Sequence, residues 1–189
     1  MIHLIGFSGS LRRASYNSAV LRAAARLVPD NCELRIESIA QIPLYNADVE
    51  SAQGAPEAVA RLKDLIAESD GLVIATPEYN NGIPGVAKNV IDWLSRPPAD
   101  GARVFRGRPV AIMGASPGGF GTVSSQNAWL PVLRSLGASV WPETRLAISR
   151  VSGLVDASDE LVDEKTLGLV REFIGGFAAH VARVRAARS

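Results

Sequence analysis

The sequence predicts an α/β protein with one parallel β-sheet, folded as a single domain over residues 1–189. Short apolar runs alternate with segments whose apolar residues recur at helical spacing, which is the pattern of βαβ units. No linker, repeat or low-complexity segment divides the chain. Unusual loops rich in polar residues, glycine or proline follow three of the predicted strands, where a parallel sheet of this kind binds ligands.

The first half of the chain is predicted to contain three strands and three helices. Apolar runs place the strands at 2–7, 34–39 and 71–75. Helical spacing places the helices at 17–28, at 56–68 and from Pro84 onward, since proline is tolerated in a first helical turn. The buried stripe of the third helix is predicted to be Val86, Val90, Trp93 and Leu94.

The second half is predicted to add two strands and two helices, five of each in all. A loop is expected at 96–108, a strand at 109–114, a helix at 122–136 and a short edge strand at 138–141. Pro131 should kink the helix or mark its true start. The clearest element is the C-terminal helix, whose apolar face is formed by Val170, Phe173, Ile174, Phe177, Val181 and Val184.

Composition favours a small-molecule partner. The net charge of +1 gives no field that would attract nucleic acid or anionic lipid, and no apolar run approaches the roughly 20 residues that span a bilayer. Cys32 is the single cysteine, so an internal disulfide, a CxxC pair and a cysteine zinc site are excluded. The N-terminus carries no secretion signal, which makes the cytoplasm the expected location. No metal site is predicted.

The first unusual loop, 9–17, predicts a phosphate site. It places Ser10, Ser15 and Asn17 as donors and Arg12 as a cation at a helix N-terminus. The alternative is an ordinary strand-to-helix turn with a capping residue. Neither GxGxxG nor a P-loop occurs here, so a monophosphate ester fits better than a pyrophosphate or triphosphate.

The second loop, 76–85, is held between two prolines beside one aromatic ring. A flat heterocycle with polar edges could lie there, with its ring nitrogens and carbonyls meeting backbone groups and Asn80. The alternative is a rigid turn without a ligand, because proline and asparagine are common turn residues.

The third loop, 114–121, contains four glycines, which let the backbone approach a ligand closely. It also matches GxSxG, the nucleophile elbow of α/β-hydrolases, at Ser116, with aspartates and His180 following in hydrolase order. Pro117 argues against a hydrolase, because the residue after the nucleophile must donate its backbone N–H to the oxyanion hole and proline has none. Losing such a donor costs about 3 kcal/mol of transition-state stabilisation.

Together, the motifs GSLRRASYN, PEYNNGIPGVAKNVIDW and the 114–121 loop, with the segment IPLYNADVE, resemble the NADPH-dependent FMN reductase family. That family includes quinone, azo-dye and chromate reductases. The resemblance implies a flavodoxin-like sandwich with strand order 2-1-3-4-5 and helices on both faces. It implies cofactor binding by Ser10, Leu11, Arg12, Ser15, Tyr16, Asn17, Pro77, Glu78, Tyr79, Asn80, Ser116, Gly118 and Gly119.

In this resemblance, the first loop holds the FMN phosphate, Pro77 to Asn80 lie against the isoalloxazine, and Ser116 closes the remaining side. Members of the family are usually homodimers or homotetramers, which gives Lys88, Asn89, Asp92 and Trp93 a role in assembly. The sequence departs from commoner forms at Pro117-Gly118 and at Val86-Ala87. These departures bear on the ring contacts and the substrate more than on FMN binding.

The predicted function is transfer of electrons from NADPH or NADH, through bound FMN, to a small acceptor such as a quinone, flavin, azo compound or metal oxyanion. The cofactor supplies the reactivity, so no catalytic side chain is predicted. Two alternatives are the serine hydrolase and a flavodoxin-like electron carrier without enzymatic activity. Flavodoxin proper is usually strongly acidic, whereas this chain is nearly neutral.

Overall fold

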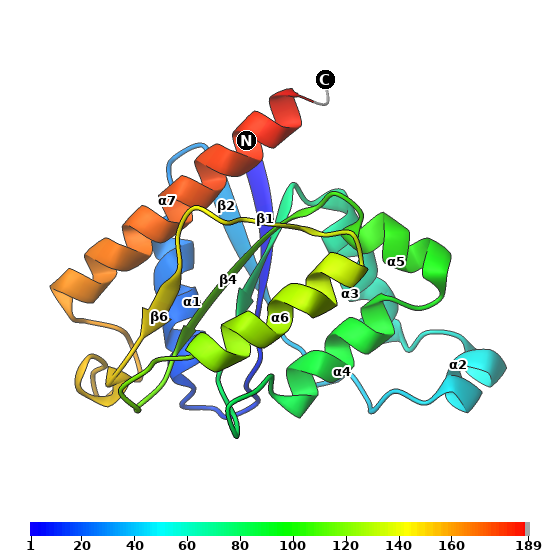
Figure 1. Cartoon of the computed structure of the whole chain (residues 1–189), viewed down its shortest axis with the longest axis horizontal. Coiled ribbons are helices and arrows are strands. Elements are labelled where there is room, and N and C mark those ends of the chain that lie inside the picture. The colour runs from blue at the N-terminus through cyan, green and yellow to red at the C-terminus, as the bar shows by residue number, and fades with distance from the viewer. Residues whose placement is uncertain (188–189) are drawn as a thin grey trace.

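The computed structural model describes residues 1–187, so positions 188 and 189 of the predicted domain lie outside the described residues. It contains one twisted sheet between two layers of helices (Figure 1). The strands are β1 (Ile2–Ser8), β2 (Cys32–Glu37), β3 (Gly71–Ala75), β4 (Pro109–Ala115), β5 (Ser139–Val140) and β6 (Leu146–Ile148). They run in the order β2-β1-β3-β4-β5 and every pair is parallel, which confirms the predicted flavodoxin-like order.

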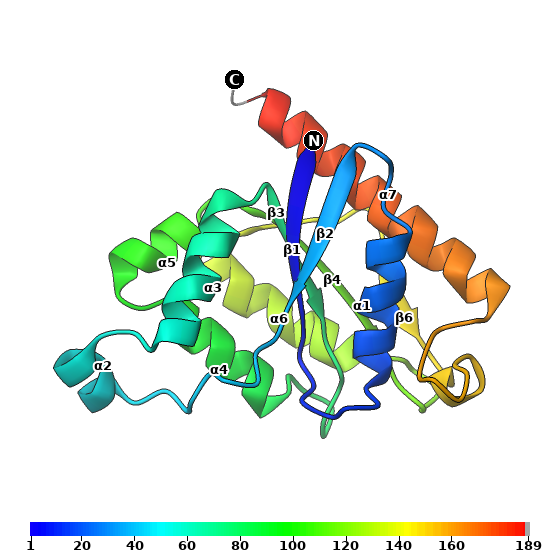
Figure 2. The same cartoon turned by 180° about the vertical axis from the view of Figure 1, so that it is seen from behind.

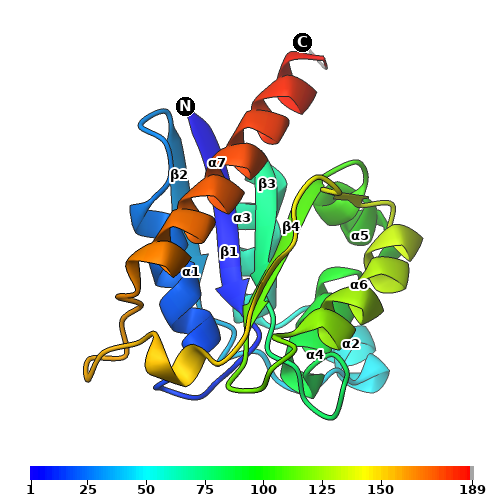
Figure 3. The same ribbon diagram turned by 60° about the vertical axis from the view of Figure 1, so that its left-hand side comes forward.

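Helices cover both faces of the sheet (Figures 2 and 3). They are α1 (Tyr16–Arg26), α2 (Ala47–Gln53), α3 (Glu57–Glu68), α4 (Gly85–Leu94), α5 (Pro98–Phe105), α6 (Val123–Ser135), α7 (Glu164–Ala186) and the 3₁₀ helix η1 (Val151–Gly153). Apolar residues of α1 and α7 form one core with the sheet, and those of α3 to α6 form the other. Alternation along β1 explains the two cores, because Leu4 belongs to the first and Ile5 and Phe7 to the second.

Two tryptophans on apolar helix faces lie in the core. Trp93 on α4 and Trp129 on α6 are both fully buried, and each ring N–H has an acceptor. Trp93 donates to the carbonyl of Pro43 at 2.9 Å, and Trp129 donates to Thr76 Oγ1 at 3.0 Å. Their burial within one chain favours the core over a subunit interface. Val86 is only half-buried, so it belongs to the edge of the α4 stripe.

The structure differs from the sequence predictions at three elements and excludes one of the two roles predicted for Pro131. Residues 96–108 were expected to form a loop, but they contain α5. The short helix α2 and the strand β6 were not predicted, so the described residues contain six strands and seven α-helices rather than five of each. β6 continues the sheet edge, because β5 pairs with the start of β4 and β6 with its end. Pro131 lies inside α6, so it does not mark the start of that helix.

Parallel strands bring the loops after β1, β3 and β4 together at one edge of the sheet, the lower edge in Figure 1. Gly114 near the end of β4 permits this close approach. A Cβ there would stand 2.0 Å from Thr122 Oγ1 and 2.3 Å from the carbonyl oxygen of Thr76. Both contacts are far inside van der Waals distance, so the fold requires glycine at this position.

Within residues 1–187, no helix has the length and apolar character needed to cross a bilayer. The same residues contain no group of three or more His, Cys, Asp or Glu side chains placed to hold a metal ion.

Candidate functional site

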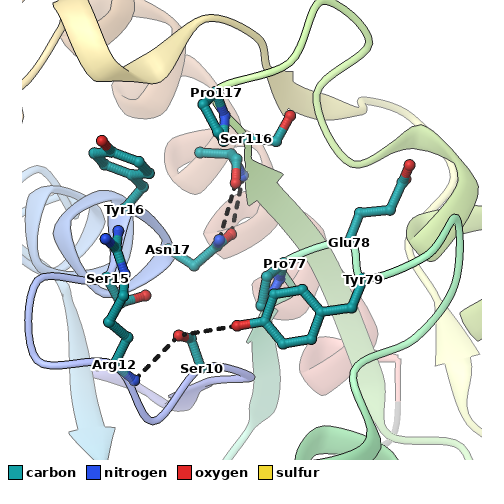
Figure 4. Close-up of a pocket in the computed structure, with 11 residues that line it drawn as sticks. Ser10, Arg12, Ser15, Tyr16, Asn17, Pro77, Glu78, Tyr79, Ser116 and Pro117 are labelled. Carbon is teal, nitrogen blue, oxygen red and sulfur yellow. Dashed lines mark hydrogen bonds between the residues drawn. The ribbon is translucent and has the colours of Figure 1, made fainter.

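A pocket of about 370 Å³ opens where the three loops meet (Figure 4). Its volume lies within the range of about 300–1,000 Å³ that is usual for ligand sites. It is lined by Ser10, Arg12, Ser15, Tyr16, Asn17, Pro77, Glu78, Tyr79, Ala115, Ser116 and Pro117. The pocket therefore has walls from all three of the loops that the sequence singled out.

The first loop presents the N-terminus of α1 to the pocket. Ser15 is the N-cap and accepts a hydrogen bond from the backbone N–H of Ser18 at 3.3 Å. Ser10 Oγ accepts one from the backbone N–H of Arg12, also at 3.3 Å. Helices leave their first N–H groups without an intrahelical acceptor, and the helix dipole makes this end favourable for negative charge. The capping interpretation of Ser15 is thus correct, and it is compatible with an anion bound at the same helix end.

Arg12 adds a cation at the mouth of the pocket. Its guanidinium carbon lies 4.8 Å from the centroid of the Tyr16 ring, in a cation–π contact. The side chain is exposed and pairs with no carboxylate among residues 1–187. The positive charge is held in place by the ring and is free to meet an anion.

Asn17 ties the first loop to the end of β4. It is 3 % exposed, and its side-chain amide both donates to the carbonyl of Ala115 and accepts from the N–H of Ala115, each at 2.9 Å. Figure 4 shows this pair of hydrogen bonds in the centre of the pocket. One amide hydrogen remains for a ligand. The paired bonds fix the distance between two of the three walls.

The second loop ends in a tight turn. Tyr79 and Gly82 form an antiparallel bridge, and the two residues between them, Asn80 and Asn81, have φ values of 50° and 60°. Positive φ at both central positions is the type I′ pattern, which asparagine tolerates well. Tyr79 is half exposed, and its hydroxyl donates to Ser10 Oγ at 3.4 Å. The Tyr79 ring lies across the pocket from Tyr16. Asn80, at the tip of the turn, does not line the pocket.

Glu78 stabilises the neighbouring helix. Its carboxylate accepts a hydrogen bond from the backbone N–H of Ser125 at 3.0 Å, in the first turn of α6. The N-cap residue of that helix, Thr122, makes no capping bond with its own side chain. A carboxylate at a helix N-terminus is electrostatically favourable. In Figure 4 the Glu78 side chain points away from Arg12, so its charge does not occupy the cationic end of the pocket.

Ser116 in the third loop is held by internal bonds. Its hydroxyl donates to the carbonyl of Gly121 at 2.7 Å, and its backbone N–H donates to Ile148 at 2.9 Å. His180 lies on α7, where Nδ1 is 3.8 Å from Glu143 and Nε2 has no hydrogen-bond partner among the described residues. Ser116 and His180 are not hydrogen-bonded to each other. The serine–histidine pair that a hydrolase requires is not formed.

The structure brings together nine of the residues that the resemblance implied, namely Ser10, Arg12, Ser15, Tyr16, Asn17, Pro77, Glu78, Tyr79 and Ser116. Leu11 lines a neighbouring hollow instead, and Asn80, Gly118 and Gly119 lie outside the pocket lining. The family resemblance did not imply a role for Ala115 or Pro117. Neither side chain is polar, so only their position at the end of a strand could have indicated them.

Comparisons with known proteins point to one family. The model of the NADPH-dependent FMN reductase family matches residues 2–153. An NAD(P)H-dependent FMN reductase from Pseudomonas aeruginosa is 42 % identical over 184 residues, which cover 97 % of each chain. The quinone reductase of Escherichia coli K12 is 36 % identical over 186 residues, again 97 % of each chain. Among solved structures, a flavoenzyme NAD(P)H:(acceptor) oxidoreductase from Paracoccus denitrificans has a TM-score of 0.86 and 31 % identity, covering 97 % of this chain and 98 % of its own.

Proposed function

The chain belongs to the NADPH-dependent FMN reductase family, and we propose that it uses FMN held in the pocket to reduce quinones with NADPH or NADH. The observation that carries the proposal is the convergence of the three loops on one pocket, with a cation at its mouth that forms no ion pair within residues 1–187. Family membership also decides against the serine hydrolase and the electron carrier without enzymatic activity.

The residues present fit a phosphate monoester at one end of the pocket. Arg12 supplies charge, Ser10 and Ser15 supply hydroxyls, and the first turn of α1 supplies backbone N–H groups. These donors suit the single phosphate of FMN. The side-chain amide of Asn17 has one hydrogen left to add to this set.

The opposite end of the pocket fits a flat ring. Pro77 offers an apolar surface, Tyr79 stands at the rim, and Ser116 with Pro117 bounds the far side. Tyr16 and Tyr79 stand on opposite sides of the pocket. We assign the isoalloxazine to this end, with backbone groups of the second loop meeting its polar edge.

FMN, when bound, accepts hydride from a nicotinamide and passes one or two electrons to an acceptor. The protein has to bind, orient and shield the reactants. No side chain in the pocket is assigned an acid, base or nucleophile role, since Glu78 caps α6 and Ser116 is bonded to Gly121.

Quinones are the acceptor class that the relatives favour. They include the quinone reductase of Escherichia coli and a 2-hydroxy-1,4-benzoquinone reductase from a Burkholderia species, 38 % identical over 173 residues. Flavins, azo compounds and metal oxyanions remain alternative acceptors that the same assay can compare.

We further propose a single domain over residues 1–189, a cytoplasmic location and a homodimer or homotetramer. The segment that contains α2 supports assembly, because no residue of α2 is buried and Leu44 beside it is 83 % exposed. Of the residues first assigned to assembly, Trp93 is buried inside the chain and Asn89 bonds to Pro43 and Tyr45, so both hold this segment in place. Size-exclusion chromatography with light scattering measures the oligomeric state.

The test of FMN binding is direct. The purified protein should be yellow, or become yellow with added FMN, and heat denaturation should release FMN intact because no covalent link is proposed. A colourless protein that shows no spectral change with FMN would end this proposal.

A further inference from the structure

Arg150 has an unusual backbone for an arginine. It follows β6 at the same edge of the sheet as the pocket, and its φ of 50° and ψ of 36° place it in the left-handed region. That region is disfavoured for residues with a Cβ, and glycine or asparagine usually occupies it. Backbone of this kind gathers at functional sites, where surrounding bonds hold it in place.

Hydrogen bonds hold the Arg150 segment against the third loop. The backbone N–H of Arg150 donates to the carbonyl of Gly118 at 3.0 Å, and that of Val151 donates to Ser116 at 3.2 Å. Ser116 and Pro117 form the far wall of the pocket. Arg150 is therefore held next to the residues that form this wall, but it does not itself line the pocket of the proposed flavin site.

The guanidinium of Arg150 is a second cation without a partner. Within residues 1–187 it makes no ion pair, side-chain hydrogen bond or ring contact. Its Nη2 atom lies 4.0 Å from the position that a Cβ at Gly119 would occupy. The positive charge of Arg150 therefore lies beside Gly118 and Gly119 and is exposed to solvent.

The fold itself does not require this glycine pair. A Cβ at Gly121 would stand 2.8 Å from Ala147, and Gly121 also has a φ of +62°. By contrast, a Cβ at Gly118 or Gly119 would find its nearest neighbours at 3.7 and 4.0 Å, and neither residue has positive φ. The surface over these two glycines is open and borders both the pocket wall and the free guanidinium.

We propose that a phosphate of the reduced nicotinamide nucleotide binds Arg150 while the nucleotide lies over Gly118 and Gly119. This inference rests on the proposed function, because it assumes that the nicotinamide enters the pocket beside the flavin. A nucleotide leaving the pocket past Ser116 and Pro117 crosses the glycine pair next. Guanidinium binds phosphate oxygens through two parallel hydrogen bonds, so Arg150 suits either the pyrophosphate or the 2′-phosphate of NADPH.

The test measures equilibrium binding of NADP⁺ and NAD⁺ to the oxidised holoenzyme by titration calorimetry. Arg150→Ala should raise the dissociation constant of NADP⁺ about tenfold, the lower range for a charge-assisted bond at an exposed site. A larger effect on NADP⁺ than on NAD⁺ identifies the 2′-phosphate, and an equal effect identifies the pyrophosphate; both support the inference. Arg171→Ala is the matched control, because Arg171 is an exposed arginine on α7 without an ion pair to residues 1–187, and it should change neither constant.

Two further variants separate binding from folding. Arg150→Gly relieves the left-handed backbone, so its melting temperature should equal or exceed that of the wild type while NADP⁺ still binds about tenfold more weakly. Gly119→Ala should weaken NADP⁺ without loss of stability, because its Cβ meets no atom closer than 4.0 Å.

Unchanged NADP⁺ and NAD⁺ binding in Arg150→Ala and Arg150→Gly, or weaker FMN binding in place of weaker nucleotide binding, contradicts the inference. A wild type that NADPH cannot reduce contradicts the proposed function instead. A wild type that NADPH reduces, with variants that bind NADP⁺ normally, contradicts only the role of Arg150.

Discussion

Replacing Arg12 with alanine should weaken FMN binding and leave riboflavin binding almost unchanged. The two ligands differ only in the phosphate, which we assign to the end of the pocket formed by Arg12, Ser10 and Ser15. The comparison therefore isolates one group of the ligand and one side chain of the protein.

The magnitude follows from the exposure of Arg12. A hydrogen bond to a charged group contributes about 1.5–3 kcal/mol, and solvent screening favours the lower figure for an exposed side chain. About 1.5 kcal/mol corresponds to roughly a tenfold rise in the dissociation constant of FMN. Added salt should reduce the difference between wild type and Arg12→Ala, because the interaction is open to counterions.

Flavin fluorescence on the refolded apoprotein gives both dissociation constants. Arg13→Ala is the matched control, because Arg13 is also exposed but does not line the pocket. Equal weakening of FMN and riboflavin by Arg12→Ala would mean that the arginine supports the pocket as a whole and that the phosphate lies elsewhere. No effect on either ligand would contradict the assignment as well.

Three further variants or treatments test other parts of the account. Gly114→Ala should destabilise the protein by several kcal/mol in chemical denaturation, since its Cβ would stand 2.0 Å from Thr122 Oγ1; a change below about 0.5 kcal/mol would refute the packing argument. Ser116→Ala should retain measurable reductase activity, and wild type should hydrolyse no simple ester; an esterase activity lost in the variant would restore the hydrolase. Burial raises the pKa of the Cys32 thiol from 9.0 to about 11, with smaller contributions from Asp70 and Glu33. Iodoacetamide at pH 8 should therefore alkylate the folded protein about a hundredfold more slowly than the unfolded chain, and equal alkylation rates would contradict the burial. For the same reason, the free energy of unfolding should fall as pH rises from about 9 through 11.

Patterns that repeat along the chain made most of the sheet predictable. β3 was predicted with its observed bounds, and β1 and β4 extend one residue further than predicted, because buried parallel strands are continuous apolar runs. The strand order came from the family resemblance, since periodicity does not specify which strands become neighbours.

The missed elements carry weak local signals. β6 has only three residues and is defined by its pairing with β4, and α2 buries no residue. Neither segment therefore has a periodic pattern of apolar residues that would predict it. α5 did carry a signal, because Pro97 and Pro98 stand at its N-terminus, but Gly101 obscured it. Gly101 has a packing reason, since a Cβ there would lie 2.7 Å from the carbonyl oxygen of Ser95.

The pocket was predictable in outline and less so in detail. Glycines, prolines and hydroxyl side chains marked the three loops, and their meeting at one edge followed from parallel strands. The two hydrogen bonds between Asn17 and Ala115 and the capping of α6 by Glu78 join residues far apart in the sequence. Their chemistry allows many partners, so only the fold selects these.

Reduction of the bound flavin by a nicotinamide nucleotide tests the central claim most directly. The holoenzyme is mixed with NADPH or NADH in the absence of oxygen, its visible spectrum is followed, and a quinone is then added. The account predicts that the flavin absorption bleaches on addition of the nucleotide and returns with the quinone. A flavin spectrum that stays unchanged with both nucleotides would contradict the account.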